Sequence, residues 1–170
     1  MMKILAMDTS NKALSLAILE NKELLGQVTL NIKKNHSITL MPAIDFLMNS
    51  LDMQPTDLDR IAVAQGPGSY TGLRIAVATA KTLAHTLKIE LVGVSSLQAL
   101  IPEQVEGLVI PVMDARRNNV YVGFYQSGQA VRPEAHLPLA EVLEIAGAAN
   151  QPVTFVGETA AFAEQIKAAL

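Results

Sequence analysis

The sequence has 170 residues, of which 50% are apolar and 17% are charged, with a formal net charge of −3 and no cysteine. This composition supports a folded core, excludes disulfides and cysteine metal sites, and disfavours a protein that binds nucleic acid alone, since such proteins are usually basic. No apolar run approaches the roughly 18–20 residues of a membrane span, and MMKILAM is too short for a signal peptide, so we expect a cytoplasmic protein without a membrane contact.

Hydrophobic periodicity predicts three strands, then alternating helices and strands, in the first half of the chain. A hairpin turn at Glu20–Glu23 separates the second strand from the third. Ser37 is the expected N-cap of the first helix, and Pro42 comes early enough in it to be tolerated. The predicted elements are strands at Lys3–Met7, Leu14–Ile18 and Leu24–Leu30, a helix from Ser37 to about Leu51, a strand at Ile61–Ala64, a helix at Gly72–Leu87, a strand at Leu91–Val94 and a short helix opened by Ser95 or Ser96.

The second half begins as the first half does. Ile4–Leu19 aligns without a gap on Ile110–Tyr125, so that Met7-Asp8 falls on Met113-Asp114 and the alternating apolar positions coincide. The shared dipeptide and the shared order of elements predict an internal duplication. The remaining elements expected in this half are a strand at Ala130–His136, a helix at Leu139–Ala148, a strand at Val153–Val156 and a helix from Thr159 to the end.

Three antiparallel strands followed by helical crossovers are typical of ribonuclease-H-like domains. Two such domains in tandem predict an α/β protein of the actin-like ATPase superfamily, which also includes sugar kinases. We expect residues 1–101 to form the N-terminal ribonuclease-H-like lobe and residues 102–170 to form a partial, truncated second lobe.

Three segments carry a more specific resemblance: MKILAMDTS, AQGPGSYTGLRIAVATAKTLA and VGVSSLQAL. With them the whole chain resembles the TsaB family, also called YeaZ. The resemblance implies a non-catalytic dimerisation subunit that binds TsaD, and with it the ATPase TsaE, in the complex that transfers a threonylcarbamoyl group to adenosine next to the tRNA anticodon. It also implies contact with tRNA only through the complex, and family members that run further than this chain. From the broad apolar stripes described below, which the chain would offer to TsaD, we expect a homodimer when the chain is alone.

Two other functions stay open at this point. One is an active enzyme, either an ATP-dependent kinase or a transferase of the actin-like superfamily. The other is a homodimeric interaction protein with no role in tRNA. Titration with ATP and magnesium separates the enzyme from the interaction proteins, and capture of partners from a bacterial lysate separates the two interaction proteins from each other.

Asp8 and Asp114 begin the turns in which actin-like ATPases hold phosphates and magnesium. Here the turns read DTSNK and DARRN, without the glycine that lets a phosphate approach closely. One interpretation is that each aspartate accepts local N–H groups and caps its own turn. The other is a weak, vestigial nucleotide site, whose candidates are Asp8, Thr9, Ser10 and Asp114, with Arg116 and Arg117 able to pair with a phosphate or with a carboxylate of a partner.

The segment GPGSYTG lies between a predicted strand and a predicted helix, where a phosphate-binding loop is often found. It lacks the lysine of a P-loop and does not read GxGxxG. Gly66 and Gly68 flank Pro67, which suits a sharp turn, and Gly72 suits close approach of the helix to a neighbouring element. We therefore expect these three glycines to form a structural loop that serves packing.

No catalytic residue, metal site or cofactor is predicted. His36, His85 and His136 are far apart and match neither HxxxH nor HExxH, and G-x-S-x-G is absent. In the related TsaD a metal-binding histidine pair follows the corresponding helix, whereas the sequence here reads SLQAL from Ser96 to Leu100. Those side chains offer no imidazole or carboxylate to a transition metal.

Two predicted helices carry apolar stripes that are broader than one buried face requires. On the first, Met41 and Met48 lie beside the inward stripe, and methionine is common at binding patches. The alternative is a wide, fully buried face; the resemblance favours an interface, because TsaB pairs with TsaD through helices of this lobe. The expected interface residues are Met41, Met48, Leu73, Ala76, Val77, Ala80 and Leu83, and the basic edge formed by Arg74, Lys81, His85 and Lys88 is most simply a solvated face.

Overall fold

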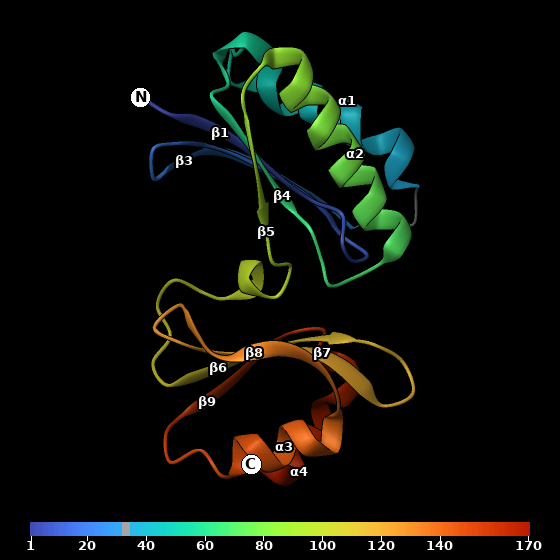
Figure 1. Ribbon diagram of the computed structural model, residues 1–170, viewed down its shortest axis with the longest axis vertical. Helices are drawn as coiled ribbons and strands as arrows, with labels where there is room; N and C mark the ends of the chain where they lie inside the picture. The colour runs from blue at the N-terminus through green and yellow to red at the C-terminus, as the bar shows by residue number, and fades with distance from the viewer. Residues whose placement is uncertain (32–34) are drawn as a thin grey trace. The chain divides into compact units, whose positions relative to one another are not determined.

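The computed structural model describes residues 1–31 and 35–170, and the chain divides into two units, Met1–Ser96 and Leu97–Leu170. Each unit is a mixed β-sheet with helices packed on one of its faces (Figure 1). Among the described residues, no helix combines the length and the apolar character that a membrane crossing requires.

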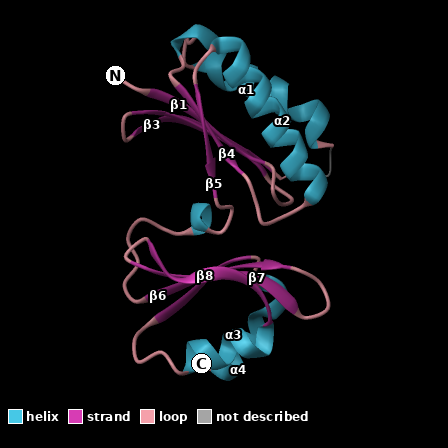
Figure 2. Ribbon diagram, in the orientation of Figure 1, coloured by secondary structure: helices cyan, strands magenta, loops and turns pink. Residues whose placement is uncertain are grey.

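The first unit contains a five-stranded sheet in the order β3-β2-β1-β4-β5 (Figure 2). Strand β1 pairs antiparallel with β2 and parallel with β4, so Leu5 lies opposite Ile18 on one side and Ile61 on the other. Because side chains alternate along a strand, these three residues share one face of the sheet, and all are fully buried. The strands are β1 (Lys3–Asp8), β2 (Leu14–Glu20), β3 (Glu23–Leu30), β4 (Arg60–Ala64) and β5 (Glu90–Val94).

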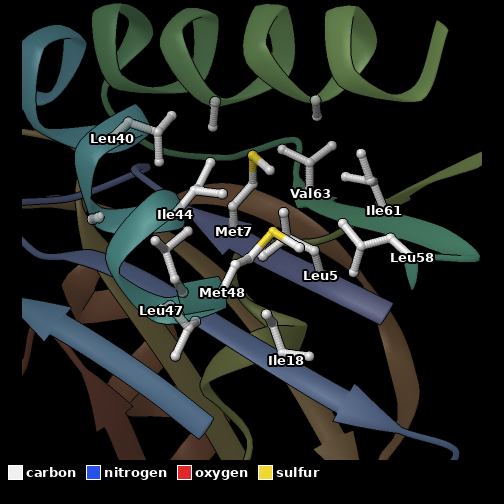
Figure 3. Close-up of a cluster of buried hydrophobic side chains, with 14 of the residues drawn as sticks. Leu5, Met7, Ile18, Leu40, Ile44, Leu47, Met48, Leu58, Ile61 and Val63 are labelled. Atoms are coloured by element: carbon white, nitrogen blue, oxygen red, sulfur yellow. The ribbon is translucent and has the colours of Figure 1, made fainter. Parts of the chain in front are cut away.

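Helices α1 (His36–Ser50) and α2 (Tyr70–Leu87) cover that face of the sheet. Their inward side chains join those of the strands in one apolar cluster (Figure 3). Helix α2 buries a row of small residues, Gly72, Ala76, Ala80 and Ala84, which lets its backbone lie close to β4. A short 3₁₀ helix, η1 (Pro55–Asp57), precedes β4.

The start of α1 differs from the expectation. Asn35, not Ser37, is the N-cap: its side-chain oxygen accepts the N–H of Ser37 at 3.0 Å. Asparagine and serine are about equally good in this role, so residue type alone could not choose between the two positions.

The second unit contains a four-stranded sheet in the order β8-β7-β6-β9. Its helices pack against a core in which Ile110, Val120 and Leu139 are fully buried. The elements are η2 (Gln98–Leu100), β6 (Leu108–Asp114), β7 (Asn119–Gln126), β8 (Gln129–Pro138), α3 (Leu139–Gly147), β9 (Val153–Gly157), η3 (Ala160–Phe162) and α4 (Ala163–Ala169).

The two sheets repeat one topology. β6 is antiparallel to β7 and parallel to β9, as β1 is antiparallel to β2 and parallel to β4. Asp8 and Asp114 are the last residues of the equivalent strands β1 and β6. The predicted duplication of a ribonuclease-H-like α/β unit is therefore confirmed.

Candidate functional site

The turn after β1 satisfies its own polar groups. The Asp8 carboxylate accepts the N–H of Ser10 at 2.7 Å, so the aspartate caps the turn that it begins. The Thr9 hydroxyl donates to the carbonyl oxygen of Gly72 at 2.7 Å, and the bond is buried. This turn is thus tied to the first turn of α2.

The glycine loop packs directly on this turn. The N–H of Ser69 donates to the carbonyl oxygen of Ser10 at 2.6 Å, and the Ser69 hydroxyl caps α2 by accepting the N–H of Gly72. A Cβ on Gly72 would overlap the carbonyl oxygen of Thr9, and a Cβ on Gly68, whose φ is +152°, would overlap that of Ser10. Only glycine permits these approaches, so the space beside Gly68 and Gly72 is filled by the backbone of the β1 turn.

Gly66 is held by Ser96, which follows shortly after the end of β5. Its N–H donates to the Ser96 hydroxyl at 3.2 Å, and its carbonyl oxygen accepts the N–H of Ser96 at 2.8 Å. The loop therefore bridges the ends of β1, β4 and β5 as a packing element.

The positions of Thr9 and Ser10 contradict a role for their side chains in nucleotide binding as the chain stands. Both residues are buried, at 0% and 1% exposure, and the Thr9 hydroxyl already donates to Gly72. The Ser10 hydroxyl is buried with no hydrogen-bond partner among the described residues. A phosphate could reach neither hydroxyl without separating the turn from the glycine loop.

Asp114 repeats the local geometry of Asp8. Its carboxylate accepts the N–H of Arg116 at 2.8 Å, and its own N–H donates to the Glu158 carboxylate at 2.8 Å. Arg116 and Arg117 are exposed and have positive φ. Each aspartate thus caps its own turn, as the first interpretation of the sequence predicts.

Helix α1 presents an exposed apolar face. Ile38, Met41 and Phe46 are 67%, 48% and 63% exposed, and Asp45 is the one acidic or basic residue of α1 other than His36. Ile38, Pro42 and Phe46 follow each other at four-residue steps, so they lie along one face. Met41 was expected on this surface from the sequence, whereas Ile38 and Phe46 were not, although the four-residue spacing of Ile38, Pro42 and Phe46, opposite the inward stripe, is a signal for them.

Several residues expected at the interface lie in the core. Met48 is 5% exposed and lies beside Leu5, Met7 and Ile18 (Figure 3). Ala76 and Ala80 are fully buried in the same cluster. The expectation for these three residues is wrong, because α1 buries a wide face and the small residues of α2 serve its approach to the sheet. Leu73, Val77 and Leu83 are half-buried, and the last two pack against the core.

The three histidines lie apart in the parts of the chain that the structure describes. His36 contacts the carbonyl oxygen of Asn11 at 3.1 Å, His85 is exposed on α2, and His136 packs against the Tyr121 ring. Within residues 1–31 and 35–170, no group of three His, Cys, Asp or Glu residues is placed to hold a metal ion.

Comparison with known proteins gives consistent matches. The family model described as "TsaD: tRNA N6-adenosine threonylcarbamoyltransferase" matches residues 23–170. The tRNA threonylcarbamoyladenosine biosynthesis protein TsaB of Bacillus subtilis (strain 168) is 44% identical over 171 residues, which cover 97% of this chain and 75% of that protein. The structure of YeaZ from Pseudomonas aeruginosa is 34% identical with a TM-score of 0.73, covering 81% of this chain and 68% of that one.

A more distant match extends the fold assignment. The activator of the 2-hydroxyisocaproyl-CoA dehydratase from Clostridium difficile, solved with bound ADPNP, is 15% identical with a TM-score of 0.51, covering 85% of this chain and 50% of that one. At that identity the match shows a shared fold alone.

Proposed function

This chain belongs to the TsaB/YeaZ family, and from that premise we propose that it is a non-catalytic subunit in the formation of threonylcarbamoyladenosine in tRNA. Its role is to bind TsaD, and with it TsaE, and to dimerise through the same surface when it is alone. The observation that carries the proposal is the 44% identity to TsaB of Bacillus subtilis across 97% of this chain.

The geometry of the β1 turn supports a subunit without its own nucleotide chemistry. Phosphate sites at helix N-termini require free N–H groups that point toward the ligand. At the start of α2, the Gly72 N–H is taken by Ser69, and the Ser69 N–H is taken by Ser10. A nucleotide would have to compete with both of these contacts and with the buried Thr9–Gly72 hydrogen bond.

The exposed face of α1 supports a protein partner. Ile38, Met41 and Phe46 place three large apolar side chains on one helix with a single acidic residue among them. Exposed apolar surface of this kind marks interaction sites when it is contiguous. A specific interface buries roughly 800 Å² per partner, so α1 supplies the centre of a contact that neighbouring elements must complete.

The direct test is the mass of the assembly. Purified chain mixed with TsaD should give one species with the summed mass of the two subunits, and the chain alone should have the mass of a dimer. Multi-angle light scattering after gel filtration measures both. Separate elution of the chain and TsaD at micromolar concentration would contradict the proposal.

A further inference from the structure

A basic stripe runs along α2 on a side that the core does not use. We define it as Arg74, Lys81, His85 and Lys88, all of which are exposed. Arg74, Lys81 and Lys88 are spaced by seven residues, which places successive charges about 10 Å apart on nearly the same side of the helix. Helix α2 contains no aspartate or glutamate, so its surface carries charge of one sign.

Among the described residues, no carboxylate pairs with the positive charges of the stripe. Arg74, Lys81 and Lys88 form no ion pair with another described residue. The ion pairs among the described residues are Lys3–Glu20, Arg60–Glu90 and Lys167–Glu164. The helix dipole stabilises cations near a helix C-terminus, which accounts for His85 and Lys88. It gives no stabilisation to Lys81 in the middle of α2 or to Arg74 near its N-terminus. Arg74 instead lies over the Tyr70 ring, so Lys81 is the member of the stripe that neither contact explains.

An aromatic ring stands at the N-terminal end of the stripe. Tyr70 is 74% exposed, and the Arg74 guanidinium lies over its ring, 5.5 Å from the centroid. An exposed tyrosine beside a row of cations is the combination with which proteins bind flexible nucleic acid, since bases stack on the ring while cations contact the phosphates.

We infer that the basic stripe contacts the backbone of the RNA on which the complex acts, with Tyr70 stacking on an unpaired base or a ribose edge. This inference rests on the proposed function. Each strand of a duplex offers a phosphate about every 3.4 Å along its axis. Cations spaced about 10 Å apart can therefore each lie near a phosphate, whichever phosphate the first cation contacts. An acidic protein face would need carboxylates at the same spacing. The net charge of −3 makes the chain a weak RNA ligand when alone, so the contact contributes within the assembly.

The test uses the complex of this chain with TsaD and TsaE and a fluorescein-labelled, unmodified tRNA transcript. The stripe variant carries Arg74→Gln, Lys81→Gln and Lys88→Gln. The control variant carries Lys22→Gln, Arg132→Gln and Lys167→Gln, which remove three exposed positive charges from parts of the chain outside α2. Fluorescence anisotropy at several KCl concentrations gives the affinity and its salt dependence.

The stripe variant should assemble normally but bind the transcript at least about tenfold more weakly. In a plot of log affinity against log salt concentration, the magnitude of its slope should be smaller by about 2 to 3, because each phosphate contact contributes about 0.7 to 0.9 to the slope. The control should keep the wild-type affinity and slope. Tyr70→Ala should weaken binding about tenfold, whereas Tyr70→Phe, which keeps the ring, should not.

Three outcomes would overturn the inference or separate it from the proposed function. Wild-type RNA affinity in the stripe variant would show a merely solvated face. Loss of assembly in that variant would assign the stripe to a protein contact. If the wild-type chain itself fails to join TsaD, the proposed function fails, and ultraviolet crosslinking of the isolated chain to the transcript at low salt then tests the stripe: equal crosslinking of wild type and stripe variant would refute it.

Discussion

At the scale of single residues, the contact between the β1 turn and the glycine loop decides what this site can do. The sequence predicted that Asp8 caps its turn and that the glycines serve packing, because turn chemistry is local and is visible in short segments. It could not predict that the Thr9 hydroxyl bonds to Gly72, since these residues are far apart along the chain and meet only through the sheet. The burial of Thr9 and Ser10 thus favours the turn-capping interpretation over the weak, vestigial nucleotide site that the sequence left open.

Gly72 gives a stability prediction at this scale. Gly72→Ala should destabilise the first unit by about 1–3 kcal/mol, because the new methyl group overlaps the Thr9 carbonyl oxygen. Gly147→Ala is the matched control, since its nearest atom would lie at 3.9 Å, and it should be neutral or stabilising by up to about 1 kcal/mol. Urea unfolding followed by circular dichroism compares them, and equal stability of Gly72→Ala and wild type would refute the packing role.

Asp8 gives a functional prediction at the same scale. The isolated chain should hydrolyse no ATP above background with magnesium present, and Asp8→Ala should leave that result unchanged. The substitution should instead cost about 1 kcal/mol of stability, because it removes the acceptor for the Ser10 N–H. Asp8→Asn keeps an acceptor oxygen and should lose less. Multiple turnovers that Asp8→Ala abolishes would establish an active enzyme.

At the scale of elements, periodicity identified most helices and strands but not which side of α1 faces out. Leu40, Ile44 and Leu47 mark the inward face, and Met48 lies only about 80° from Leu40 around the helix axis. The apolar arc of an ordinary core-facing helix is more than about 100° wide, so Met48 falls within it. Met48 is consequently buried, whereas Met41, about 100° from Leu40, is half exposed.

Met48 and Phe46 should respond differently to the same charge. Met48→Glu should unfold the first unit or destabilise it by roughly 2 kcal/mol or more, because the carboxylate would be buried without a partner. Phe46→Glu should leave stability within about 0.5 kcal/mol but weaken both self-association and TsaD binding. Gln27→Glu adds the same charge at an exposed position on β3 and should change neither property.

Thermal melting and light scattering on the three variants distinguish a lost fold from a lost contact. A Phe46→Glu protein that stays dimeric and binds TsaD as wild type does would place the interface on another face of the unit.

At the scale of the whole molecule, the repeat was the most informative signal in the sequence. Met7-Asp8 and Met113-Asp114 lie at the ends of equivalent strands, and the order β8-β7-β6-β9 matches the first four strands, β3-β2-β1-β4, of the other sheet. Such agreement is predictable because apolar alternation and strand order are properties of long segments. The partner surface was less predictable, because a helix that faces a partner and a helix that faces a core carry similar apolar patterns.

The central claim, that this chain acts as a stoichiometric subunit, is tested most directly by titrating it into a reconstituted reaction. TsaD, TsaE, an unmodified tRNA transcript and threonylcarbamoyl adenylate are held constant while the chain is added, and threonylcarbamoyladenosine is quantified by mass spectrometry of the digested tRNA. The initial rate should rise in proportion to the chain and become constant at a fixed molar ratio to TsaD, and Phe46→Glu should shift that ratio upward. A full rate at amounts far below TsaD, or a rate independent of the chain, would contradict the account.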